Sequence, residues 1–193
     1  MKQLLALLGC AAVLLGLVGC QNTGRDFRSD FSKKLESEGK APEFLAGNWK
    51  ADRFDWEIEL KTDGEISRIF HTLCSAPINL SEGGLYQENP LEGVSLTFIL
   101  GPCKASYNRD KRRLNVKIII DYFEMKVQTI TEVKVQTITL KGRREDYFTG
   151  QVSEDGRQWN ALVREYSYFE GEGPPDIDYA DNHPEPLVFT KSR

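Results

Sequence analysis

The chain is poor in the residues that build metal and nucleophile sites, with two histidines and four cysteines among 193 residues. It has no Gly-rich phosphate loop, Cys-x-x-Cys pair, His-Glu-x-x-His helix or Gly-x-Ser-x-Gly elbow. Neither His71 nor His183 has a second histidine or cysteine at ligand spacing, so the sequence predicts no metal, no cofactor and no catalytic residues. Basic side chains are outnumbered by acidic ones, 25 to 29, which disfavours nucleic acid as a partner.

Long hydrophobic runs are also scarce, and the longest lies at the N-terminus. Lys2 precedes an uncharged run, residues 4–19, that is rich in leucine, alanine and glycine. A charged start, an apolar middle and small residues at the end are typical of a secretory signal peptide. The run is shorter than the roughly 20 apolar residues that a spanning helix needs. We therefore expect a segment that directs export and does not span the membrane.

The run ends in Leu17-Val18-Gly19-Cys20, which resembles the lipobox of bacterial lipoproteins. The resemblance implies that residues 1–19 are removed and that Cys20 carries a diacylglycerol and a further acyl chain such as palmitate. Several acyl chains on one residue hold a protein on a bilayer much more firmly than one chain does. The alternative is an ordinary cleaved signal peptide or a short uncleaved anchor.

The same resemblance implies a place in the bacterial cell envelope, with the membrane as a partner through the lipid. An aspartate directly after the lipidated cysteine tends to retain lipoproteins at the inner membrane of enteric bacteria, and this chain has Gln21 there. The expected location is the outer membrane facing the periplasm, or the outer face of the cytoplasmic membrane where the source has one membrane.

Two cysteines besides the anchor remain in the exported chain, Cys74 and Cys103. Exported proteins occupy compartments where disulfides form, so we predict that these two pair. The bridge would constrain the unfolded chain by roughly 3 to 4 kcal/mol in the loop-entropy model. The alternative is two reduced, buried thiols, because the sequence does not show how far apart they lie.

Residues 20–46 are predicted to hold the lipidated cysteine, a polar tether and one short helix. Phe27, Phe31 and Leu35 recur at every fourth residue, and Gly39 can end the helix. The apolar stripe either packs against the domain or rests at the lipid surface. We favour packing, because a face of mixed charge gains little from anionic headgroups.

From Gly47 onward the apolar residues recur at every second position. Alternation with charged residues predicts a strand with one dry face, carried by Phe54, Trp56, Ile58 and Leu60. Asp63-Gly64 predicts a tight hairpin turn. Residues 74–93 contain several glycines and prolines and predict a long connection with at most one short strand, of the kind that carries function or covers an opening. Residues 94–100 resume the alternation.

Residues 114–141 contain neither glycine nor proline and are rich in β-branched side chains. One strand of this length would run about 90 Å, too far for a domain of this size, so the segment must bend or reverse. Its apolar positions change phase between Tyr122 and Met125, which predicts a bulge or turn. Residues 124–131 are repeated almost identically at 132–139, which we interpret as a duplication that lengthened a hairpin. Gly142 to Arg144 predicts a further turn.

The remaining segments complete an all-β domain over residues 47–193. Strands are expected at 146–152, 159–169 and 187–190, with an acidic strap rich in proline and glycine at 171–186. About eight antiparallel strands joined by tight turns predict a barrel or a sandwich. Hairpins between sequence neighbours favour an up-and-down barrel.

Gly47-Asn48-Trp49 is similar to the Gly-x-Trp motif that opens the first barrel strand in the lipocalin and calycin group. The resemblance implies a lipocalin-like, up-and-down antiparallel β-barrel of about eight strands after a short N-terminal helix. It also implies that Trp49 packs across the closed end of the barrel beneath an arginine, for which Arg164 stands at the matching position. That contact places a cation over an aromatic face.

Five large aromatic residues are the candidate ligand-binding set: Trp56, Phe98, Tyr122, Trp159 and Tyr166. Small barrels are either filled by such side chains or keep a cavity for one ligand, and both alternatives stay open at this point. We expect a non-enzymatic, membrane-anchored lipoprotein that binds a small apolar or amphipathic ligand in its barrel. The alternative is an envelope structural or protein-interaction module with a filled barrel core.

Overall fold

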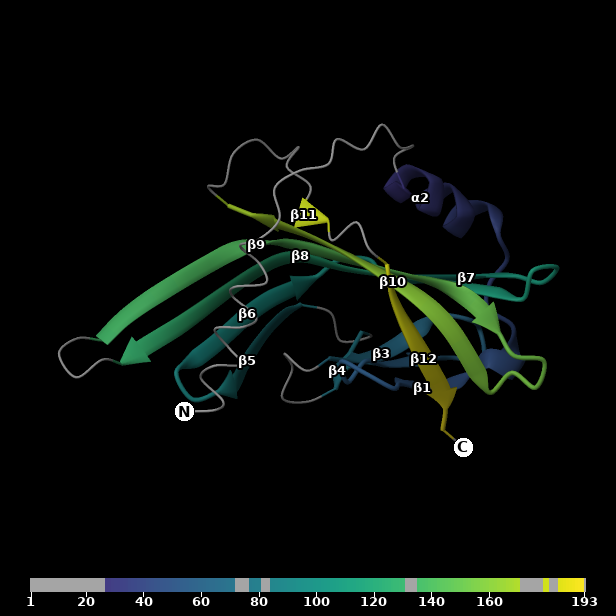
Figure 1. Cartoon of the computed structure of the whole chain (residues 1–193), viewed down its shortest axis with the longest axis horizontal. Coiled ribbons are helices and arrows are strands. Elements are labelled where there is room, and N and C mark those ends of the chain that lie inside the picture. Colours follow the sequence, from purple (N-terminus) through teal and green to yellow (C-terminus); the bar gives the residue numbers. More distant parts are fainter. Residues whose placement is uncertain are drawn as a thin grey trace. The chain divides into compact units, whose positions relative to one another are not determined.

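The strands form one antiparallel sheet, shown in the computed structural model of Figure 1. The structure describes residues 27–71, 77–80, 84–130, 135–170, 179–180 and 184–192. Two helical segments come first, α2 (Phe27–Ser37) and the 3₁₀ turn η1 (Glu43–Leu45). The strands are β1 (Gly47–Ala51), β2 (Glu57–Leu60), β3 (Ile66–Phe70), β4 (Ile78–Asn79), β5 (Leu85–Leu91), β6 (Val94–Leu100), β7 (Lys104–Asn108), β8 (Arg113–Ile130), β9 (Val135–Val152), β10 (Gln158–Phe169), β11 (Tyr179–Ala180) and β12 (Glu185–Lys191).

The sheet curls into a half-barrel, so the predicted all-β, barrel-like class is confirmed. Its strand order is β4-β3-β2-β1-β12-β10-β9-β8-β6-β5, with β7 also on β8 and β11 on β10. The first and last strands of the domain lie side by side, because Trp49 of β1 pairs with Lys191 of β12. The sheet has more strands than the predicted eight, and β4 and β5 form its two edges.

Alternating side chains on the inner face of the sheet form the hydrophobic core. Trp56, Ile58 and Leu60 of the predicted dry face are at most 5% exposed. The largest side chains of this core contact one another through their rings, with centroids 4.7 Å apart for Trp159 and Phe189 and 5.1 Å apart for Trp56 and Phe148. The interior at this end of the sheet is therefore filled.

The repeat builds the end of the long β8–β9 hairpin. Each strand has 18 residues, and the first copy pairs with the second, as Gln128 does with Thr137. The predicted bulge is present as a register shift, but it lies between Ile120 and Phe123, slightly before the predicted place between Tyr122 and Met125. In Figure 1 this hairpin reaches well past the end of β10.

The turn predicted at Gly142 to Arg144 is wrong, because β9 runs straight through it to Val152. Gly142 pairs with Phe169 of β10, and a Cβ on this glycine would lie 1.9 Å from the Tyr168 carbonyl oxygen. The glycine therefore allows two backbones to approach closely, which is the other common role of glycine in a strand.

Residues 74–93 hold more strand than the sequence predicts. Both β4 and β5 lie in this segment, and β5 includes Pro90, which an edge strand tolerates because its outer N–H is not needed in a ladder. The alternation of β5 is hidden by the prolines and glycines around it.

The segment before Gly47 packs with the sheet. The chain divides into two units, Met1–Phe31 and Ser32–Arg193, so residues 32–46 belong to the sheet domain. The Tyr107 N–H donates to the Gly39 carbonyl over 2.7 Å, and Leu45 is fully buried. The predicted helix is confirmed as α2, which ends at Ser37 shortly before Gly39. Neither described helix is long and apolar enough to cross a membrane.

Candidate functional site

A cavity of about 470 Å³ lies near the two edges of the sheet. Its apolar wall comes from the end of α2, β3, the segment after β4, β5 and the β6–β7 connection. The apolar lining residues are Leu35, Ile66, Leu80, Tyr86, Leu100, Pro102 and Ala105. This volume is within the range of about 300 to 1,000 Å³ that small-molecule sites occupy.

The edge strands β4 and β5 approach each other without a strand ladder between them in the described residues. The Tyr86 hydroxyl donates to the Asn79 carbonyl over 3.0 Å, and the Tyr86 ring stacks on Phe98 at 5.3 Å between centroids. On the other side, β6 and β7 both pair with β8, and Gly101-Pro102 connects them as an irregular segment. The cavity lies where regular strand pairing is interrupted.

Besides Gly64 and Gly101, the lining includes four polar residues: Lys40, Glu65, Cys103 and Lys104. The two lysines are exposed, and no ion pair or hydrogen bond of either side chain occurs within the described part of the chain. Glu65 lies 4.0 Å from the Lys61 ammonium on its own hairpin. The opening of the cavity therefore carries a local excess of positive charge.

Cys103 has a free thiol in the structure, and burial raises its pKa to about 11. The thiol is therefore protonated at neutral pH and is a poor nucleophile. The predicted partner Cys74 lies outside the described residues. The predicted disulfide is not seen, and the pairing stays a prediction.

A charged cluster lies on the inner face of the sheet. Arg144 donates to both carboxylate oxygens of Asp146 over 2.9 to 3.1 Å and lies 3.0 Å from Glu165 of β10. Asp146 is fully buried, and this burial raises its pKa although Arg144 opposes the shift. The cluster links β9 and β10 through Arg144, which forms a buried ion pair with Asp146 and a second ion pair with Glu165. Removing one partner would leave a buried charge without its counter-charge, which is strongly destabilising.

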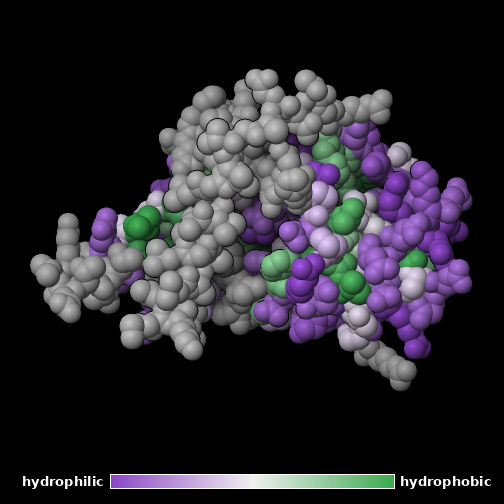
Figure 2. All heavy atoms as spheres, in the orientation of Figure 1, coloured by the Kyte–Doolittle hydropathy of each residue, from purple (hydrophilic) through white to green (hydrophobic). Residues whose placement is uncertain are grey.

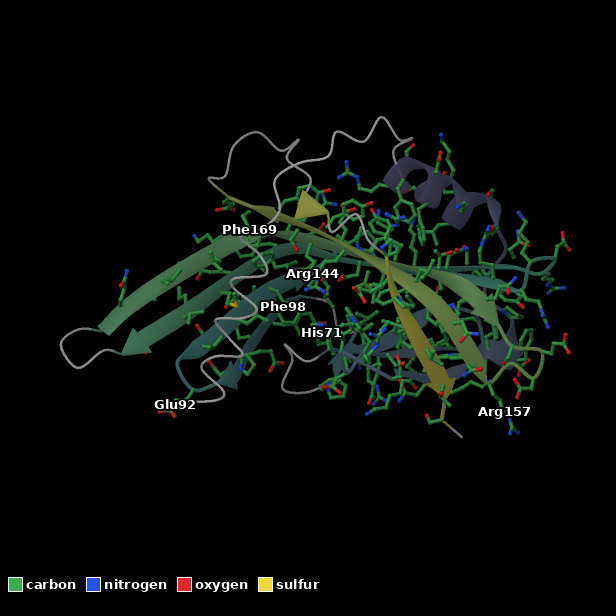
Figure 3. The ribbon with its side chains drawn as sticks, in the orientation of Figure 1. His71, Glu92, Phe98, Arg144, Arg157 and Phe169 are labelled. Carbon is green, nitrogen blue, oxygen red and sulfur yellow. The ribbon has the colours of Figure 1, made fainter. Side chains whose placement is uncertain are left out.

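His71 lies next to this cluster (Figure 3). Its ring packs at 4.4 Å on Trp56, and burial together with the Arg144 charge lowers its pKa to about 3. The imidazole is therefore neutral at physiological pH and acts as part of the aromatic wall.

Replacing His71 with phenylalanine is expected to remove one source of acid instability. Only the unfolded chain protonates this residue between pH about 6.5 and about 3, so its contribution lowers stability as the pH falls through that window. The free energy of unfolding of the wild type should be about 2 kcal/mol lower at pH 5 than at pH 7 because of His71. His71→Phe should lack this part of the decrease. Urea unfolding at both pH values measures the difference, and an equal loss in both proteins would contradict the assignment.

None of the five predicted ligand-binding aromatics is among the described residues that line the cavity. Trp56, Phe98 and Trp159 are buried in the core on the inner face of the sheet. Tyr166 contacts Tyr147 on the opposite face, at 5.5 Å between ring centroids. Tyr122 lies within the register shift between Ile120 and Phe123, and its hydroxyl donates to Glu124 over 3.3 Å. The predicted set therefore does not line this cavity, although Phe98 stacks on Tyr86, which does.

Trp49 and Arg164 are not brought together. Val163, the neighbour of Arg164, pairs with Glu185, whereas Trp49 pairs with Lys191, about 20 Å further along β12. The cation over Trp49 is the Lys191 ammonium, 5.7 Å from the ring centroid, and the indole N–H donates to the Leu45 carbonyl over 2.9 Å. The expected cation contact exists, but the last strand supplies it.

Hydrophilic side chains cover most of the described surface on the face in Figure 2, with small hydrophobic patches between them. Phe54, expected on the dry face of a strand, is 51% exposed in the turn after β1 with a φ of 62°. The Arg53 guanidinium lies 5.6 Å from its ring centroid. The strand alternation begins at Trp56, after this turn.

The residues missed by sequence reasoning are Lys40, Tyr86 and Lys104. The long connection at 74–93 was the available signal, since it predicts an opening, and Leu80 and Tyr86 of that segment do line the cavity. No family model, curated protein or solved structure matches the chain.

Proposed function

We propose that this chain is a non-enzymatic, lipid-anchored protein of the bacterial cell envelope that binds a small apolar or amphipathic ligand. The observation that carries the ligand proposal is the cavity of about 470 Å³. Its lining combines seven apolar residues with a few polar groups, which is the usual composition of a small-molecule site. The protonated Cys103 thiol in its wall favours binding over nucleophilic chemistry.

The binding test uses the full chain with Cys20→Ser, which carries no acyl chains of its own that could enter the cavity. The neutral apolar fluorophore N-phenyl-1-naphthylamine should bind with increased fluorescence. Leu100→Trp, which places a large ring in the cavity, should weaken binding at least about tenfold. Leu162→Trp is the matched control, because Leu162 is 44% exposed and lies outside the lining. Failure of the Cys20→Ser chain to bind the fluorophore, or equal affinity of the Leu100→Trp and Leu162→Trp variants, would refute the ligand proposal.

The anchor proposal rests on Leu17-Val18-Gly19-Cys20, which lies outside the described residues. Cys20→Ser is expected to abolish acylation and either release the protein from membranes or leave its signal uncut. Mass spectrometry of membrane extracts measures both outcomes. Cys10→Ser is the control and should leave acylation unchanged, since Cys10 falls within the segment to be removed. Lipid found on the Cys20→Ser chain would refute this anchor.

The second candidate is an envelope structural or protein-interaction module. The packed inner core favours it, because Trp49, Phe148 and Trp159 are fully buried and fill one end of the curled sheet. The binding test distinguishes the two candidates. A ligand-binding protein shows saturable fluorophore binding that Leu100→Trp weakens, whereas a module with a filled core shows no such binding.

A further inference from the structure

We infer that the ligand is an anionic amphiphile, whose carboxylate or phosphate group is held by Lys40 and Lys104 while its chain enters the cavity. This inference rests on the proposed ligand-binding function and adds the chemical class of the ligand. It starts from the placement of the two lysines, which line the same cavity from different segments.

Local strand pairing brings the two lysines to one opening. Gly39 forms a bridge with Tyr107, so the segment after α2 runs antiparallel beside β7. Lys40 follows Gly39 directly, and Lys104 begins β7. With Gly39 opposite Tyr107, Lys40 lies opposite Ser106 and diagonal to Lys104. Diagonal neighbours on antiparallel strands lie about 7 to 8 Å apart. Long, flexible lysine side chains can bring two ammonium groups to one anionic group across that distance.

Neither Lys40 nor Lys104 forms an ion pair with another described residue. Most basic residues elsewhere in the sheet face a carboxylate, as Lys50 does with Glu57 and Arg68 with Glu59. No such pair involves either cavity lysine in the part of the chain that is described. In a chain with a net charge of −4, two cations that form no ion pair with the described residues give this opening a local excess of positive charge.

The carboxylate in the lining does not cancel this charge. Glu65 is the acidic residue among the described lining residues, and it lies 4.0 Å from Lys61. The same cavity is also lined by the apolar residues Ile66, Leu80 and Leu100. A positive opening above an apolar wall matches a molecule with an anionic head and a hydrocarbon chain, because a charged hydrogen bond to ammonium is stronger than a neutral one.

The experiment compares ligands that share one chain and differ in the head group. Dodecanoate, dodecyl phosphate, 1-dodecanol and dodecyltrimethylammonium compete with N-phenyl-1-naphthylamine on the full Cys20→Ser chain at low salt. Dodecanoate and dodecyl phosphate should bind at least about tenfold more tightly than 1-dodecanol, and the cation most weakly. Raised salt should reduce the advantage of the anions.

The variant K40A/K104A should lose the preference for the anions and keep its affinity for 1-dodecanol. The control K111A/K126A removes the same net charge outside the cavity and should keep the preference. Equal affinity of the wild type for dodecanoate and 1-dodecanol would overturn the anionic class and leave ligand binding intact. Absence of binding by all four compounds and the fluorophore would overturn the proposed function itself.

Discussion

Gly150→Ala is expected to destabilise the folded chain by at least about 3 kcal/mol, one of the largest single effects in this sheet. Gly150 lies in β9 between two pairing partners, Leu114 of β8 and Ala161 of β10. An added Cβ would lie 1.8 Å from the Asn160 carbonyl oxygen and 2.6 Å from its carbon. These are backbone atoms, so relief requires the β9–β10 ladder to separate.

Urea unfolding followed by tryptophan fluorescence measures this change. Gly39→Ala is the matched control, because its Cβ would meet the Tyr107 oxygen at 3.9 Å, an ordinary contact, and Gly39 has no positive φ. The control should stay within about 1 kcal/mol of the wild type. If Gly150→Ala unfolded at the same urea concentration as Gly39→Ala, the close approach of β9 and β10 would be wrong.

Glu38→Ala is expected to cost about 3 to 5 kcal/mol, because it removes the acceptor at the centre of a polar network. The carboxylate of Glu38, whose side chain is 9% exposed, pairs with Arg113 and accepts from Asn115, Asn108 and Ser106. Without it, the partly buried guanidinium of Arg113 loses its carboxylate. The same network joins the segment after α2 to β7 and β8, so its loss also weakens that connection.

The neighbouring arginine supplies a control with the same chemistry at the surface. Arg112 pairs with Glu154 at 3.0 Å, but the Glu154 side chain is 88% exposed. Glu154→Ala should therefore cost less than about 1 kcal/mol. Glu38→Gln, which keeps one acceptor oxygen and loses the charge, should fall between the two in free energy of unfolding. Equal values for Glu38→Ala and Glu154→Ala would show that the network does not stabilise the fold.

The amphipathic periods predicted the elements that depend on near neighbours in the chain. The four-residue period of Phe27 and Phe31 marks α2, and the two-residue period from Trp56 to Leu60 marks the dry face of β2. The change of phase predicted between Tyr122 and Met125 lies next to the register shift in β8, which falls between Ile120 and Phe123. Each signal follows from burial of one face of a single element, so it is present before any long-range pairing is known.

Glycine and charged residues predicted their structural roles less well, because these roles depend on segments far away in the sequence. Gly142 indicates a turn by its type, but the approach of Tyr168 from β10 explains it as part of a strand. Arg164 fits the position of a barrel-closing cation, but the register of β12 places Lys191 over Trp49 instead. Residue type alone does not distinguish these alternatives.

Lipid attachment at Cys20, export and an all-β domain are expectations that local sequence supports, because a short motif and a side-chain period carry them. The position and the charge of the cavity are determined by the tertiary structure. Lys40 and Lys104 lie far apart in the chain, and they line one opening because Gly39 pairs with Tyr107. The sheet stays open between its edge strands β4 and β5, because each of the other strands pairs with its neighbours and these two do not pair with each other. Such neighbours are set by strand register and backbone approach, which depend on the whole fold and on no single segment.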